Sequence, residues 1–213
     1  MLRKRRTRKP APGRSGSFSR RSFLKSMGLG AAVAAAPARL LPAQGKRGSP
    51  LRGPGAVPVE LTVNGRKVKR EIEPRVTLLD LLRDRLDVTG PKKVCDRAEC
   101  GACSVIRDGR LIYACTALAI ECEGSEITTP EGLAPEGEMH AAARAFVECD
   151  GFQCGFCTPG QVIALKALLD KHPDPTPEQV RIGLSGNLCR CGAYVKIRRA
   201  ATTAAAMLAG GGR

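Results

Sequence analysis

The chain of 213 residues contains no tryptophan, only 3% aromatic residues and two histidines. A hydrophobic core must therefore be built from Ala, Leu, Ile and Val, which bury less area per residue than aromatic side chains. This composition is typical of small domains to which bound metal ions add cross-links.

Acidic residues are absent from the N-terminal region. Residues 1–59 contain fourteen Lys or Arg and no Asp or Glu, whereas residues 60–213 contain twenty-one basic and twenty acidic residues. The net charge of +15 therefore belongs to the N-terminus, and the remainder is nearly neutral. A basic patch interleaved with aromatics is missing there, which argues against nucleic-acid binding.

The N-terminus has the organisation of an export signal. Arg20 and Arg21 precede Phe23, Leu24 and Lys25, and an apolar stretch from 27 to 36 leads to a small-residue cleavage site. Residues 1–38 resemble a twin-arginine signal peptide, which predicts export of the folded protein to the periplasm. The apolar stretch is too short for a stable membrane anchor. The alternative is a basic disordered arm that binds a partner surface.

A Gly/Pro-rich linker, residues 39–56, precedes a predicted mixed α and β region, residues 57–134. Two alternating apolar runs, 59–63 and 68–72, flank Asn64-Gly65, which is a strong hairpin signal. A helix is predicted from the N-cap Thr77 to Leu86. Further strands are expected at Ser104–Arg107 and Leu111–Ala114, which form a second hairpin, and at Ala117–Glu121 and Glu126–Thr128.

Helical patterns fill residues 135–209. Four helices are predicted, at Met139–Cys149, Thr158–Lys171, Thr176–Ser185 and Ala193–Leu208. Thr158 is expected to cap the second of them, with Pro159 in its first turn. The chain is therefore predicted to be α+β, with a mixed first domain and a small helical bundle as the second.

Eight of the ten cysteines form two quartets. The first has the spacing C-x4-C-x2-C-x11-C and consists of Cys95, Cys100, Cys103 and Cys115. The second has the spacing C-x2-C-x31-C-x-C and consists of Cys154, Cys157, Cys189 and Cys191. Four thiolates are the ligand set of an iron-sulfur cluster or of a structural zinc ion.

The spacings favour iron-sulfur clusters. C-x4-C-x2-C is the plant-type [2Fe-2S] pattern, and the single residue between Cys189 and Cys191 is awkward for a zinc knuckle. A thioredoxin-like dithiol at Cys154 and Cys157 would be expected after a strand, whereas the surroundings are helical. Zinc remains an alternative, as do disulfides because of the export signal.

The ordered combination CDRAECGACSV, DGRLIYAC, GFQCGFCTPG and GNLCRCGAY resembles the two-cluster iron-sulfur subunit of the molybdenum hydroxylases, the xanthine oxidase family. The resemblance covers residues 57–208 and, with the leader, is greatest to the subunit of a periplasmic aldehyde oxidoreductase. Ala98 stands where the family usually has Gly, and CGAY replaces the commoner CTGY.

The resemblance implies a β-grasp ferredoxin-like domain followed by an all-α four-helix domain, each with one [2Fe-2S] cluster. It implies a large partner subunit that holds a molybdenum pterin, with Gln153 and Cys191 next to that pterin. Electrons would enter at the second quartet and leave from the first to an FAD subunit or an external acceptor. The chain itself would be a non-catalytic electron-transfer subunit of an oxidoreductase, with aldehydes as the favoured substrate.

Several other residues have structural interpretations. Cys122 and Cys149 are interpreted as buried free thiols, with a disulfide as the alternative. His140 and His172 lack a ligand-like spacing, and Asp96 and Glu99 are expected on a solvated loop face. Arg190 either raises a cluster potential or lies in an interface.

Two other functions remain open at this point. A zinc-stabilised interaction module would use the same thiolates without redox chemistry. A free-standing exported ferredoxin would keep the clusters without a molybdenum partner, although it would not need the helical domain.

Overall fold

The structure is a computed structural model that describes residues 19–21, 52–134 and 137–210. The predicted signal peptide and its cleavage site, residues 1–38, lie outside the described residues except for 19–21. Residues 51–213 form one compact unit, which contains both cysteine quartets. Within the described ranges, none of the helices has the length and apolar character needed to cross a bilayer.

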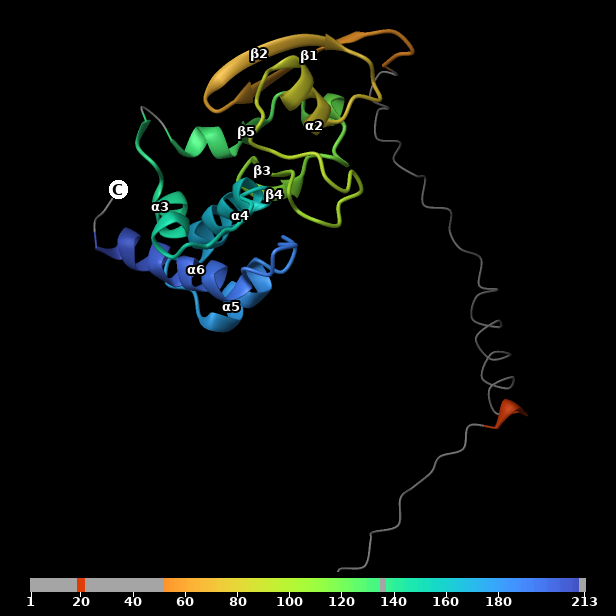
Figure 1. The fold of residues 1–213 in the computed structure, drawn as a ribbon. Coiled ribbons are helices and arrows are strands. Elements are labelled where there is room, and N and C mark those ends of the chain that lie inside the picture. Colours follow the sequence, from red (N-terminus) through yellow and green to blue (C-terminus); the bar gives the residue numbers. More distant parts are fainter. Residues whose placement is uncertain (1–18, 22–51, 135–136, 211–213) are drawn as a thin grey trace, which may run out of the picture. The chain divides into compact units, whose positions relative to one another are not determined.

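A five-stranded sheet forms the first half of this unit (Figure 1). Its strands are β1 Val57–Val63, β2 Arg66–Ile72, β3 Ser104–Arg107, β4 Arg110–Tyr113 and β5 Glu126–Thr128. The spatial order is β2-β1-β5-β3-β4, and only the β1/β5 pair is parallel. Both predicted hairpins are confirmed. In the first, Asn64 and Gly65 have φ of 50° and 76°, as a two-residue hairpin turn requires.

The predicted leucine-rich helix begins at Thr77, whose Oγ1 accepts from the Asp80 N–H at 3.1 Å. It consists of one α-helical turn, α2 Leu78–Asp80, and a wider π-helical turn, η1 Leu81–Arg85. Its four buried leucines join the apolar side chains of β1 and β5 in one core. This core also contains Cys103 and Cys115, so the first quartet is attached to it.

The predicted strand at 117–121 is wrong. Apart from a bridge between Leu118 and Thr77, this segment forms a 3₁₀ turn, η2 Ala119–Cys122. Ala119 and Cys122 are both fully buried. A 3₁₀ turn places residues three apart on the same side, whereas a strand would point them to opposite faces. A second 3₁₀ turn, η3 Pro130–Leu133, follows β5.

All four predicted helices of the second half are confirmed, with small shifts of their ends. They are α3 Ala141–Glu148, α4 Thr158–Lys171, α5 Pro177–Gly183 and α6 Tyr194–Ala209. Thr158 does not cap α4, because the helix includes Thr158 and Cys157 occupies the capping position without a side-chain bond. The α3 and α6 helices pack through alanines, whose small side chains allow a close approach.

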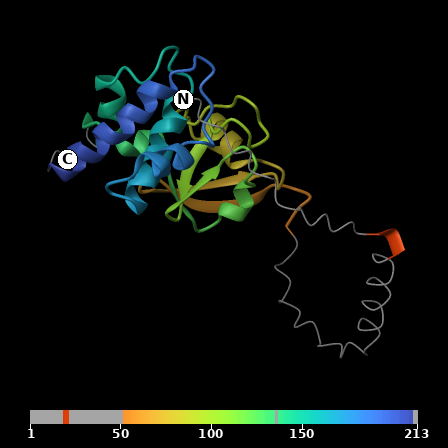
Figure 2. The same ribbon diagram turned by 90° about the horizontal axis from the view of Figure 1, so that it is seen from below.

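The α4 helix is buried on nearly all sides because it lies between the sheet and the other helices (Figures 1 and 2). β3 is accordingly buried on both of its faces: Val105 belongs to the core of the first half and Ile106 to that of the helical half. Successive strand residues point to opposite faces, so β3 joins the two cores. The loops that carry Cys100 and Cys189 meet at this junction, through a hydrogen bond from the Leu188 N–H to the Cys100 carbonyl.

Candidate functional site

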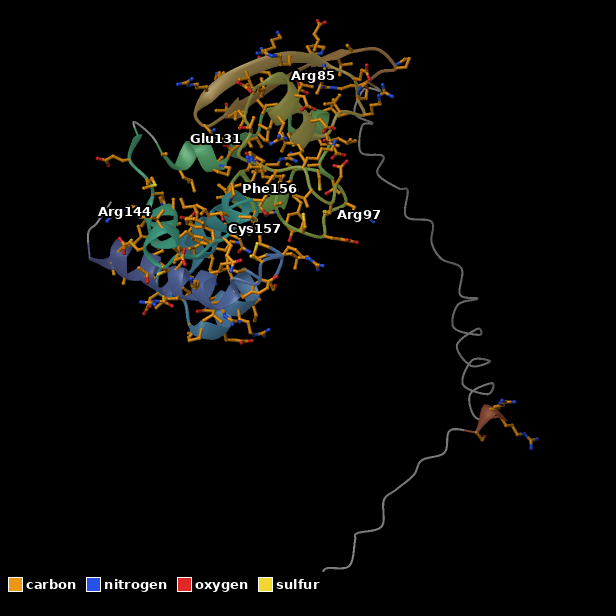
Figure 3. The ribbon with its side chains drawn as sticks, in the orientation of Figure 1. Arg85, Arg97, Glu131, Arg144, Phe156 and Cys157 are labelled. Carbon is orange, nitrogen blue, oxygen red and sulfur yellow. The ribbon has the colours of Figure 1, made fainter. Side chains whose placement is uncertain are left out.

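The first quartet lies in the irregular loop between η1 and β3 and at the end of β4. Cys95 and Cys100 are half-buried, whereas Cys103 and Cys115 are buried. The loop reverses direction repeatedly, with positive φ at Asp96, Ala98 and Gly101. Figure 3 shows Arg97, in the same loop, pointing outward.

Backbone amides of this loop point at the sulfur atoms. The Ala98 N–H donates to Cys115 Sγ at 3.3 Å. Burial raises the pKa of Cys95, but N–H groups of Arg97, Glu99 and Cys100 outweigh burial and lower that pKa to about 7. Burial raises the pKa of Cys103 to about 12. Metal binding would therefore release a proton from the inner thiol.

The second quartet is assembled from two helix connections. Cys154 and Cys157 immediately precede α4, and Cys189 and Cys191 lie between α5 and α6. Cys154 and Cys191 are exposed and their Sγ atoms are 3.5 Å apart. Cys157 is half-buried and Cys189 is buried. Phe156 and Cys157 are labelled in Figure 3, where the loop before α4 meets the sheet half.

Backbone groups support this quartet in the same way. The N–H of Phe156 and the Cys191 thiol lower the pKa of Cys154. Burial raises the pKa of Cys189, but hydrogen bonds from the N–H groups of Ala193, Cys191 and Gly192 lower it by more. The pKa of Cys189 is therefore lowered overall. Burial raises the pKa of Cys157 to about 12. The Cys189 N–H donates to the Tyr194 hydroxyl at 2.9 Å, which fixes the second cysteine loop against α6.

Thiols of the same quartet lie close to one another. Cys154 and Cys191 Sγ are 3.5 Å apart. The pKa values of Cys95, Cys103 and Cys157 are each shifted in part by a second thiol of the same quartet, namely Cys100, Cys115 and Cys189. Among the side chains that the structure describes, no three His, Cys, Asp or Glu converge closely enough to hold one metal ion. Two thiolates per metal and two metals per quartet is the ligand requirement of a [2Fe-2S] cluster, so this donor set fits that group.

The two quartets approach each other at a small hollow of about 100 Å³. Its lining includes Cys100 from the first quartet and both Cys154 and Cys157 from the second. The Leu188 N–H donates to the Cys100 carbonyl at 2.9 Å, which joins the two cysteine loops directly.

Other predicted residues lie in varied surroundings. Gln153 is exposed beside Cys154, and Arg190 is exposed between two thiols and borders the hollow. Asp96 forms an ion pair with Lys93 at 3.4 Å, and Glu99 is exposed, as expected for a solvated loop face.

Neither remaining cysteine belongs to a quartet. Cys122 is fully buried, and Cys149 Sγ lies 3.3 Å from Thr203 Oγ1. Both are free thiols in the structure. His140 caps α3, and His172 Nδ1 lies 3.3 Å from Gln179 Nε2.

Sequence reasoning missed Asn187 and Gln161, two buried polar residues between the quartets. Asn187 Nδ2 reaches the first loop, at Gly101 O and Ser104 Oγ. Two signals in the sequence point to these residues. Asn187 lies only two positions before Cys189, and Gln161 is a polar residue within the apolar sequence of α4. Neither signal identifies a partner in the other half of the chain.

Comparison with known proteins identifies similar iron-sulfur subunits. A family described as "[2Fe-2S] binding domain" matches residues 129–202. The aldehyde oxidoreductase iron-sulfur-binding subunit PaoA of Escherichia coli O157:H7 is 40% identical over 205 residues, which cover 89% of each protein. The nicotinate dehydrogenase small FeS subunit of Eubacterium barkeri is 44% identical over 144 residues, covering 68% of this chain and 92% of that subunit.

Solved structures agree. Quinoline 2-oxidoreductase from Pseudomonas putida 86 has a chain that superposes with a TM-score of 0.71 and 35% identity, covering 75% of this chain and 99% of that chain. Aldehyde oxidoreductase from Desulfovibrio gigas gives a TM-score of 0.68 and 39% identity over 73% of this chain and 17% of its own. With two thiol quartets on this fold, the chain belongs to the two-cluster [2Fe-2S] electron-transfer subunits of the molybdenum hydroxylase family.

Proposed function

We propose that each quartet ligates one [2Fe-2S] cluster. The ligands of the first are Cys95, Cys100, Cys103 and Cys115, and those of the second are Cys154, Cys157, Cys189 and Cys191. The observation that carries this assignment is that the fold brings the thiols of each quartet together, as in Cys154 and Cys191, 37 residues apart, whose Sγ atoms lie 3.5 Å from each other. When bound, such a cluster supplies one-electron redox chemistry. The corresponding domains are residues 57–134 and 135–209, after a linker at 39–56.

The second quartet is the proposed entry point for electrons. Its outer pair, Cys154 and Cys191, is exposed, and exposed apolar side chains surround this part of the chain. They are Phe156, Leu188, Tyr194 and Val195, with Val195 73% exposed. Apolar surface of this kind is favourable when a partner covers it. We assign it to the large molybdenum-pterin subunit, with Gln153 and Cys191 nearest the pterin.

Electrons would then pass to the first quartet and leave to an FAD subunit or an external acceptor. An aldehyde is the proposed substrate, which is oxidised to a carboxylate in the large subunit. The 40% identity to an aldehyde oxidoreductase subunit supports this choice. The twin-arginine pattern in residues 1–38 supports export of the folded, cluster-containing protein to the periplasm.

Charge introduced into the apolar surface tests this arrangement. Phe156 is 53% exposed beside the second quartet, and Ile182 is 58% exposed on α5. Co-purification of the large subunit should be lost with Phe156→Asp and retained with Ile182→Asp, because only the first site would be covered. Equal retention with both variants would contradict the proposed docking side.

A further inference from the structure

Asn187 is a buried link between the two cysteine loops. The residue is 2% exposed and lies two positions before Cys189. Its side-chain Nδ2 donates to the Gly101 carbonyl at 2.8 Å and to Ser104 Oγ at 3.1 Å. Gly101 directly follows Cys100, and Ser104 directly follows Cys103. One amide group of the helical half therefore holds two points of the first cysteine loop.

The backbone of Asn187 is held as well. Its carbonyl accepts from Gln161 Nε2 at 2.8 Å, and Gln161 is fully buried in α4. On the opposite side, a Cβ added at Gly101 would lie 2.7 Å from Asn187 Nδ2. The loop, the amide and α4 are thus packed without space for an additional carbon, which restricts movement of Asn187.

This arrangement determines where Leu188 lies. Leu188 stands between Asn187 and Cys189, and its N–H donates to the Cys100 carbonyl at 2.9 Å. This hydrogen bond therefore connects Cys100 of the first quartet with the residue that directly precedes Cys189 of the second quartet. Asn187 and Leu188 together form three hydrogen bonds across the boundary between the two loops. Two of the three come from the Asn187 amide.

We propose that Asn187 is a positioning residue that fixes the separation of the two clusters and thereby the transfer of electrons between them. The proposal rests on the ligand sets given under the proposed function. With both centres bound, one electron would leave the centre held by the second quartet, which would be oxidised, and would reach the centre held by the first, which would be reduced. The rate of this step depends on the distance that Asn187 maintains.

The chemistry at this position requires an amide. Its NH₂ group supplies two donors, which match the Gly101 carbonyl and the Ser104 hydroxyl. A carboxylate has only acceptors and would face the Gly101 carbonyl oxygen with like partial charge. Asn187→Asp therefore conserves shape and breaks the bond to the Gly101 carbonyl, with the Ser104 hydroxyl as the one remaining donor to it, whereas Asn187→Ala removes both bonds and the volume.

The test uses the complete complex, reduced with dithionite and measured by low-temperature electron paramagnetic resonance. Two nearby paramagnetic clusters split each other's signals to an extent that falls steeply with separation. We expect Asn187→Asp and Asn187→Ala to keep both clusters, to lose or reduce this splitting, and to slow reduction of the first cluster after rapid mixing with substrate. Asn64→Ala is the matched control, because that amide links Asn64 to Thr129 away from both quartets.

Wild-type splitting and transfer rate in both Asn187 variants would overturn the proposal. If either variant fails to fold with both clusters, Asn187→Ser keeps one donor at the same site and should still reduce the splitting; unchanged splitting there would also overturn the proposal. Failure of the ligand assignment is distinguishable, because the unmodified complex would then lack two [2Fe-2S] signals.

Discussion

The Ala98 N–H donates to Cys115 Sγ at 3.3 Å although Ala98 has a left-handed backbone, with φ of 59°. The left-handed region favours glycine, and the turn forms here with alanine. A non-Gly residue in this region is strained by about 1 kcal/mol because its Cβ crowds the following carbonyl. The hydrogen bond to sulfur therefore depends on a strained residue in the first cysteine loop.

Ala98→Gly should relieve this strain. We expect the free energy of unfolding to increase by up to about 1 kcal/mol, reduced by the greater entropy of glycine in the unfolded chain. Urea unfolding of the cluster-containing protein measures the change. Ala102→Gly in the same loop lacks this positive φ, so it should destabilise, and stabilisation by both variants would contradict the explanation.

Two threonines at helix starts should respond differently to substitution. Thr176 forms a capping box with Gln179. The Gln179 N–H donates to Thr176 Oγ1 at 3.2 Å, and the Thr176 N–H donates to Gln179 Oε1 at 2.7 Å. Thr158 Oγ1 is buried without a hydrogen-bond partner in the described part of the chain. Thr176→Val should cost about 1 kcal/mol of unfolding free energy, whereas Thr158→Val should be neutral or stabilising. Equal losses in urea unfolding would disprove this distinction.

The half-buried His140 should make stability depend on pH. Its Nδ1 accepts from the Ala142 N–H at 3.1 Å, which requires a ring nitrogen without a proton. Burial, followed by the charge of Lys166, lowers the pKa of His140 below 6.5, and Asp170 opposes the shift. The unfolded chain then binds a proton more readily than the folded chain. This contribution is therefore complete above pH 6.5 and decreases as the pH falls below that value.

Urea unfolding of wild type and His140→Asn at neutral and mildly acidic pH measures this contribution. Asn retains a capping oxygen and does not titrate, so the variant should lose less stability on acidification. The same loss in both proteins would assign the acid sensitivity to other groups.

Gly160 brings α4 against the first cysteine loop. A Cβ at this position would overlap the Gly101 carbonyl oxygen, its nearest neighbour, and would lie 3.1 Å from Ala102 Cα and 3.2 Å from Ala102 O. Gly160→Ala should therefore cost about 1–3 kcal/mol of unfolding free energy and alter the signal of the first cluster. Gly210→Ala, whose added Cβ would lie 3.4 Å from its nearest neighbour, Ala206 O, serves as the control. An unaltered signal in Gly160→Ala would contradict the predicted effect on the loop.

Much of the fold followed from local sequence signals. Asn64-Gly65 identified the first hairpin, and apolar periodicity with Pro159 and Pro177 located two of the helices. The error at 117–121 arose because short apolar runs do not distinguish a strand from a 3₁₀ turn. The prediction that Thr158 caps α4 was wrong because the cysteine loop ends one residue earlier, so that Cys157 occupies the N-cap position.

The spacing of the cysteines is sufficient to group them into two quartets, because tight loops require short intervals between ligands. The close approach of Cys154 and Cys191 could not be predicted in this way, since these residues are 37 positions apart and meet only after α4, α5 and α6 pack. The Asn187 link also depends on the docking of the two halves. Periodicity describes each half separately and carries no information on that docking.

Removal of one ligand at a time tests the central claim, that each quartet holds its own cluster. The measurement is electron paramagnetic resonance of the dithionite-reduced complex with Cys95→Ala, Cys191→Ala or the control Cys149→Ala. We predict that Cys95→Ala and Cys191→Ala each abolish or alter a different [2Fe-2S] signal and leave the other, while Cys149→Ala retains both. Loss of the same signal in both ligand variants, or of neither, would contradict the account.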